Sequence, residues 1–220
     1  MTNQPASDAS WSRFLSASRK FSGPRRAAEL APIRAPALQQ LTPAEVALWL
    51  NNRAYTLVFL GQATDALDNL KDADELLAGD EGSSRDPLLT ACISGTRGIA
   101  LLHHGDLDAA EKALELALRQ EEEGVARQFD PEWQADPART AERWFWLGEV
   151  ARRRGELPAA RLRLERAASS STVPFGRRAQ KVLADLVQVL PGESGLAKAL
   201  PLPAAPTAVS PDSEPAIKPS

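Results

Sequence analysis

The sequence contains few of the residues that build metal centres and disulfide bonds. Among 220 residues there is one cysteine, Cys92, and there are two histidines, His103 and His104. A single cysteine excludes an internal disulfide and a cysteine-based metal cluster. Two adjacent histidines point in different directions from a helix and lack a third ligand, so we expect no metal site and no cofactor.

Motifs of catalysis are also missing. The chain has no phosphate-binding loop, no dinucleotide fingerprint after a strand and no nucleophile elbow. Cys92 and His103 fall on one predicted helix, separated along its axis by about 16 Å, which is too far for a thiolate–imidazole pair. We therefore expect that the protein is not an enzyme and has no small-molecule substrate.

Membrane and export signals are equally scarce. No stretch approaches the roughly 18 apolar residues of a membrane-spanning helix, and the first eight residues lack the basic and apolar segments of a signal peptide. We expect a cytoplasmic protein without a membrane partner. The 26 Lys and Arg against 29 Asp and Glu give a net charge of −3, which argues against nucleic acid as the partner.

What the chain does contain is an internal repeat centred on three glycines. Gly61, Gly105 and Gly155 are each followed by Ala at the fifth position, Leu at the ninth and Ala at the twelfth. Seven positions before each glycine stands a small residue: Ala54, Gly98 and Gly148. Each copy is interpreted as a helix, a tight turn at glycine and a second helix. The small residues allow the two helix backbones to approach closely.

Capping residues predict where the helices begin and end. Thr42-Pro43 with Glu45 forms a capping box with proline at the first helical position. The pairs Asp86-Pro87 and Asp136-Pro137 use the same type of start, and we expect helices to stop at Gly79, Gly105, Gly124 and Gly155. The expected helices are 43–60, 63–78, 87–104, 107–123, 137–154, 158–169 and 175–190.

Composition divides the chain into three parts. Residues 1–41 form an N-terminal arm in which residues 10–21 have the spacing of a short amphipathic helix. Residues 42–190 form the helical domain, in which the connection 124–136 is expected to pack back on the helices. Seven prolines between residues 191 and 220 predict an extended, disordered tail.

The third copy of the repeat carries a family resemblance. It rests on Trp144, Leu147, Gly148, Gly155, Ala160 and Ala167, with the apolar Leu164 between the last two. These residues resemble the tetratricopeptide repeat (TPR), whose unit is about 34 residues long. The chain departs from that family at Ala151 and Leu164, which stand where it has Tyr and Phe. The resemblance implies an all-α, right-handed helical-repeat solenoid of about three hairpins, with the last helix as its cap.

The resemblance also implies where a partner would bind. In that family the first helix of each pair lines a concave groove, whose Lys and Asn clamp for C-terminal carboxylates is absent here. By register, the partner-binding residues look like Asn51, Tyr55, Phe59, Ile99, His103, Phe145, Glu149, Arg152 and Arg153. A groove that is aromatic at one end and basic at the other suits a peptide with apolar anchors and acidic character.

Charge is distributed unevenly along the domain. Residues 44–86 and 87–138 each carry a net charge of −6, whereas residues 139–181 carry +7. This asymmetry indicates a docking surface for another protein or peptide, or head-to-tail self-association. We expect an adaptor or scaffold that binds a partner in the groove. The alternatives are a chaperone-like holder of a secretion or surface-assembly component, and a self-assembling structural module.

Overall fold

The computed structural model of the chain describes residue 30 and residues 41–79, 87–127 and 136–189. The segments 41–79, 87–127 and 136–189 form seven α-helices and hold no strand, so this part of the chain is all-α as predicted. The predicted helix 10–21, the tail 191–220 and residues 128–135 of the connection lie outside the described residues. The helices are α3 (Pro43–Phe59), α4 (Ala63–Ala78), α5 (Pro87–His104), α6 (Leu107–Arg127), α7 (Pro137–Arg153), α8 (Leu157–Ala168) and α9 (Pro174–Val189).

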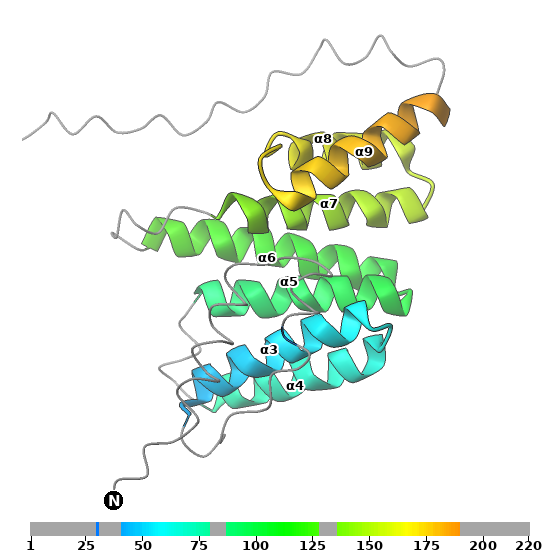
Figure 1. The fold of residues 1–220 in the computed structure, drawn as a ribbon. Helices are drawn as coiled ribbons and strands as arrows, with labels where there is room; N and C mark the ends of the chain where they lie inside the picture. Colours follow the sequence, from blue (N-terminus) through cyan, green and yellow to red (C-terminus); the bar gives the residue numbers. More distant parts are fainter. Residues whose placement is uncertain (1–29, 31–40, 80–86, 128–135, 190–220) are drawn as a thin grey trace, which may run out of the picture.

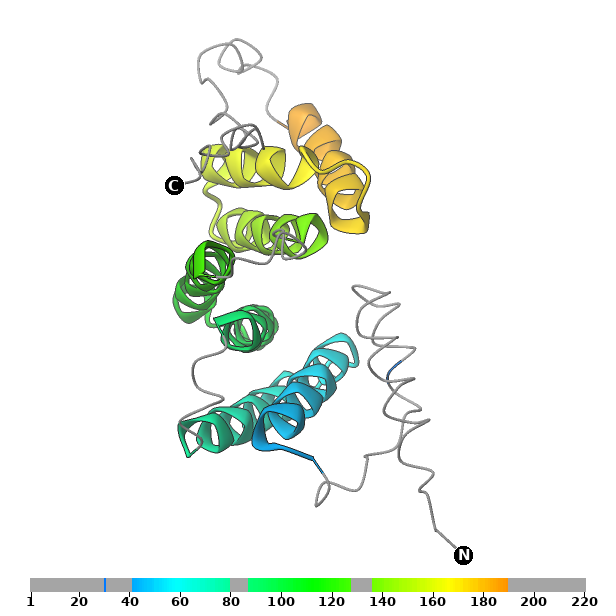
Figure 2. The same cartoon turned by 90° about the vertical axis from the view of Figure 1, so that its left-hand side faces the viewer.

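Consecutive helices pack as hairpins that are stacked in chain order. The pairs α3–α4, α5–α6 and α7–α8 pack most closely, and α9 packs on α7 and α8 (Figure 1). Helix α5 contacts both α3 and α7, and α7 contacts α9, so these four helices form one layer, which we call the inner layer. Figure 2 shows that the stack is an arc, with α3 and α9 on its open side.

The three repeated glycines make the turns of the hairpins, as predicted. Their φ angles are 80° at Gly61, 100° at Gly105 and 78° at Gly155, in the left-handed region that glycine adopts without strain. In each turn the residue after the glycine donates its N–H to a carbonyl five residues earlier, at 2.9–3.0 Å. This bond is the mark of the Schellman motif, which satisfies the free carbonyls at a helix end.

The small residues of the repeat do bring the helix backbones together. A Cβ added to Gly98 would lie 2.5 Å from Leu114 Cγ and 3.1 Å from the Ala110 carbonyl oxygen. A Cβ added to Gly148 would lie 2.7 Å from Leu164 Cγ. The repeated leucines are fully buried. The repeated residues therefore pack the two helices of each hairpin against each other.

Most helix ends agree with the predicted signals. Thr42 Oγ1 accepts from the Glu45 N–H at 3.3 Å, and Glu45 Oε2 accepts from the Thr42 N–H at 2.9 Å, which completes the capping box. Asp136 Oδ1 accepts from the Ala138 N–H at 3.0 Å at the start of α7. In the described segments, no helix has the length and apolar character required to cross a membrane.

The prediction that Gly124 stops a helix was wrong. Helix α6 continues through Gly124 to Arg127. A Cβ at Gly124 would lie 3.2 Å from Pro87 Cγ and 3.4 Å from Leu88 Cδ2. The glycine therefore allows α6 to approach the start of α5, which is a packing requirement and not a helix-stop signal.

Candidate partner-binding site

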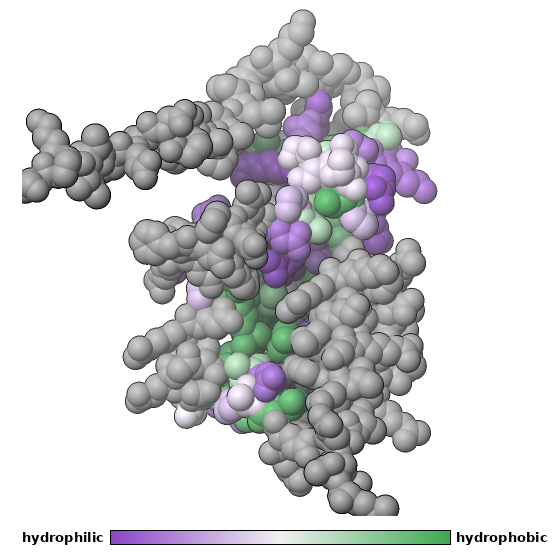
Figure 3. Space-filling view, turned by 60° about the vertical axis from the view of Figure 1, so that its left-hand side comes forward, coloured by the Kyte–Doolittle hydropathy of each residue, from purple (hydrophilic) through white to green (hydrophobic). Residues whose placement is uncertain are grey.

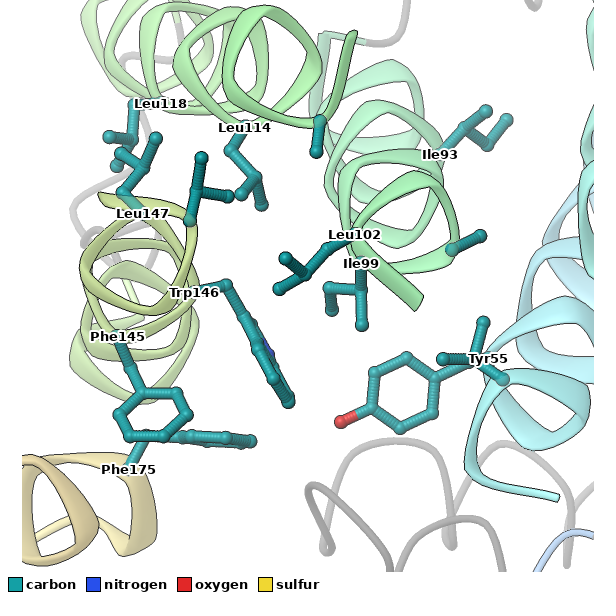
Figure 4. Close-up of a cluster of buried hydrophobic side chains, with 14 of the residues drawn as sticks. Tyr55, Ile93, Ile99, Leu102, Leu114, Leu118, Phe145, Trp146, Leu147 and Phe175 are labelled. Carbon is teal, nitrogen blue, oxygen red and sulfur yellow. The ribbon is translucent and has the colours of Figure 1, made fainter. Parts of the chain in front are cut away.

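Aromatic side chains from four helices meet on the inner layer around Trp146 of α7. The Trp146 ring centroid lies 6.3 Å from that of Phe59 on α3, 5.7 Å from His103 on α5 and 5.9 Å from Phe175 on α9. Phe59 also contacts Tyr55, with centroids 4.9 Å apart. We call Phe59, His103, Trp146 and Phe175 the aromatic cluster. Figure 4 shows the Trp146 ring directed from α7 towards the side on which Tyr55 of α3 lies.

Two arginines lie at the edge of the aromatic cluster. The Arg178 guanidinium of α9 lies 5.9 Å from the Trp146 ring centroid and 5.1 Å from that of Phe145. Arg153 of α7 donates to the Leu102 carbonyl oxygen at 2.8 Å. Among the described residues, neither guanidinium is paired with a carboxylate. Partial burial lowers the pKa of His103, and the two arginine charges lower it further.

The indole nitrogen of Trp146 has an unsatisfied hydrogen bond. The Trp146 side chain is buried, with 4% of the residue exposed, and its Nε1 has no hydrogen-bond acceptor in the part of the chain that the structure describes. A buried donor without an acceptor costs about 1–3 kcal/mol. Figure 3 shows hydrophobic residues in a recess of the surface, with hydrophilic residues above them.

A buried ionic network lies next to the aromatic cluster. Arg143 of α7, which is 4% exposed, lies 3.6 Å from carboxylate oxygens of Glu121 on α6 and of Glu142. The Tyr55 hydroxyl donates to Glu142 Oε1 at 2.6 Å and so connects α3 directly to α7. The Arg143 guanidinium packs on Gly95 of α5, where any Cβ would overlap it. Buried ion pairs of this kind fix the relative positions of the helices that contribute them.

Burial and charge act in opposite directions on these groups. Burial raises the pKa of Glu121, although the nearby Arg143 acts to lower it. Burial alone would lower the pKa of Arg143, but Glu121 and Glu142 together raise it. Arg143 is therefore a cation between two carboxyl groups, and the Glu121 carboxyl group takes up a proton more readily than an exposed glutamate does.

The acidic and basic segments of the sequence partly neutralise each other across the hairpins. Glu111 of α6 accepts from Arg154, which follows α7, and from Arg163 of α8. Arg154 also pairs with Asp108. Part of the charge asymmetry of the sequence is therefore neutralised by ion pairs between the second and third hairpins.

The structure divides the predicted binding residues into two groups. Tyr55, Phe59, His103, Phe145 and Arg153 lie in or beside the aromatic cluster. The others lie elsewhere or are already paired. Ile99 is completely buried. Asn51 is also buried, and its Oδ1 has no hydrogen-bond donor among the described residues. Glu149 binds Arg152 with a 2.8 Å Nη2–Oε2 distance.

Three residues of the site were missed by sequence reasoning. Trp146 lies seven residues before Arg153, which places both on one face of α7, so helix periodicity could have found it. Phe175 and Arg178 lie on α9, which was expected only to cap the stack. No feature of the sequence indicates that the Phe175 ring and the Arg178 guanidinium contact Trp146.

No family model matches the chain, and neither a curated protein nor a solved structure matches it. Across the described segments, no three His, Cys, Asp or Glu side chains gather into a group that could hold a metal ion. At the aromatic cluster, the described residues offer aromatic contact, the guanidinium groups of Arg153 and Arg178, and the unpaired Nε1–H of Trp146.

Proposed function

We propose that the protein is an adaptor that holds a peptide or a domain of a partner protein against the inner layer of a TPR-like, right-handed solenoid. The three glycine turns and the close approach at Gly98 and Gly148 support the repeat architecture. The observation that carries the function is the aromatic cluster, since it draws rings from α3, α5, α7 and α9 to one place.

Two exposed arginines lie beside the aromatic rings of this region. Arg is one of the residues that most often dominate the energy of protein interfaces, together with Trp and Tyr. Phe59 is half-buried, and His103, Arg153 and Arg178 are exposed, so a partner can reach the edge of the aromatic cluster. The buried Tyr55–Glu142–Arg143–Glu121 network holds α3, α6 and α7 in place beneath it. A site held in place before binding loses less entropy when its partner arrives.

Affinity purification of the tagged protein from its own host, followed by mass spectrometry, tests this proposal. The double variant His103→Ala/Arg178→Ala changes two exposed side chains of the inner layer. Leu116→Ala is the matched control, because Leu116 lies on α6 outside the inner layer and is 38% exposed. We expect a partner near one-to-one that the double variant loses and the control keeps. Equal retention by both variants, or no partner at all, would contradict the adaptor function.

A further inference from the structure

We propose that the aromatic cluster recognises a carboxylate, namely an Asp or Glu side chain next to a large apolar residue in the bound partner. Arg178 and Arg153 would supply the positive charge and the Trp146 indole would supply a hydrogen bond. This inference rests on the proposed function, because the carboxylate belongs to the partner.

The first argument is that these two charges are not used within the described structure. Other arginines at this end of α7 are neutralised by carboxylates: Arg152 by Glu149, and Arg154 by Glu111 and Asp108. Arg153 donates only to a backbone carbonyl, and Arg178 lies over aromatic rings. Both side chains are exposed, so their guanidinium groups can form charge-assisted hydrogen bonds with an incoming anion.

The second argument is the unpaired indole donor. Trp146 Nε1 is buried and has no acceptor in the described structure. Because the Arg178 guanidinium lies over the same ring, the acceptor that suits this position is an anionic oxygen. The Arg178 side chain covers part of the Trp146 ring and is long and flexible. It can move from the ring face to pair with the ligand, exchanging a cation–π contact for charge-assisted hydrogen bonds.

The third argument concerns the apolar surface beside the charges. Arg153 uses one N–H on the Leu102 carbonyl oxygen, which fixes its guanidinium beside His103 and leaves its other N–H groups for an anion. The rings of Phe59 and His103 meet edge to face, with centroids 6.4 Å apart, and offer an aromatic surface beside the two guanidinium groups. This surface suits an apolar side chain next to the carboxylate in the partner sequence.

Titration of the intact chain with two synthetic peptides tests this inference. The first is acetyl-Phe-Glu-Leu-Glu-Phe-amide, and the second replaces each Glu by Gln, which keeps the shape and removes the charge. We expect the acidic peptide to bind at least about tenfold more tightly, as a charge-assisted hydrogen bond provides. It should also shift the NMR signal of the Trp146 indole N–H, which Trp146→Phe identifies among the five tryptophans.

A matched pair of variants locates the effect. Arg178→Glu and Arg177→Glu give the same net charge on neighbouring exposed positions of α9, but Arg177 donates to the Thr172 carbonyl oxygen and makes no ring contact with the aromatic cluster. Arg178→Glu should weaken binding of the acidic peptide at least about tenfold, and Arg177→Glu less than about threefold. Circular dichroism of both variants checks that they fold.

Each outcome decides one of the two proposals. Equal binding of both peptides, no binding of either, or indifference to Arg178→Glu would overturn carboxylate recognition, while a partner captured through the inner layer would still support the adaptor. Selective binding of the acidic peptide with no captured partner would leave the carboxylate site standing and contradict the adaptor function.

Discussion

At Gly98 and Gly148 a single hydrogen atom faces a leucine of the next helix, and this sets how closely the hairpins pack. We expect Gly98→Ala to lower the free energy of unfolding by about 1–3 kcal/mol through overpacking, despite the better helix propensity of alanine. Urea denaturation measures the change. Gly79→Ala is the control, because the nearest atoms to its Cβ would be at an ordinary 3.7 Å. Equal destabilisation by both variants would contradict the close approach.

The charge of Arg143 is needed because two carboxyl groups are buried beside it. We expect Arg143→Met to lower the free energy of unfolding by about 3–5 kcal/mol at neutral pH. Part of this loss should be recovered on acidification, because the two unpaired carboxyl groups would then be protonated. Arg161→Met, which removes a pair with Glu165 within α8, should cost less than about 1 kcal/mol. Similar losses in the two variants would show that the network is not a buried one.

His103 gives the inner layer a measurable pH response. Its pKa is lowered in the folded state, whereas the unfolded chain keeps the ordinary value of about 6.5. As the pH falls through that ordinary value, the unfolded chain takes up the imidazole proton more readily than the folded chain does. His103 therefore lowers the free energy of unfolding on acidification. His103→Gln should remove this contribution, and NMR titration of the imidazole measures the pKa directly. A pKa of His103 at or above the ordinary value would contradict both the partial burial of the imidazole and the proximity of Arg153 and Arg178.

At the scale of helices, glycine and proline made most boundaries predictable. The bounds of α4 and α5 are the predicted ones, and those of α3, α7, α8 and α9 agree within one residue, because most of these ends have a local capping or turn signal. The end of α6 was not predictable in this way. Gly124 meets Pro87 and Leu88 of another helix, and such tertiary contacts leave no local signal.

Helix α9 contributes to the site as well as to the end of the stack. Phe175 is buried, and its ring centroid lies 5.3 Å from that of Phe145 and 5.9 Å from that of Trp146. We expect Phe175→Ala to lower the free energy of unfolding by about 3–5 kcal/mol and to change the near-ultraviolet circular dichroism of the tryptophans. Leu162→Ala, at a position that is 42% exposed, should leave both unchanged. An unchanged spectrum in Phe175→Ala would contradict the packing of α9 on the aromatic cluster.

For the whole molecule, attraction between the second and third hairpins depends on Glu111. This carboxylate binds Arg154 and Arg163, and these bonds keep its pKa low against the opposing effect of burial. We expect Glu111→Gln to cost about 1 kcal/mol and to reduce the dependence of stability on salt. Thermal unfolding at low and high sodium chloride measures both. An equal salt dependence in the variant and the original chain would place the electrostatic stabilisation elsewhere.

The candidate site was predictable only in part. Tyr55, Phe59, His103, Phe145 and Arg153 followed from the register of the first helix in each hairpin. The long-range contacts of Trp146, Phe175 and Arg178 depend on how α9 packs on the third hairpin, where it contacts both α7 and α8. Periodicity assigns a residue to a helix face but does not determine which distant residues that face will contact.

A photo-crosslinking residue placed on each side of the arc tests the central claim most directly. Benzoylphenylalanine would replace Phe59, which lies in the aromatic cluster, or Leu116, which is exposed on α6 outside the inner layer. Irradiation in the host should then join a partner protein covalently to position 59 and not to position 116. A crosslink at position 116 alone would show that the partner binds outside the inner layer and would contradict the account.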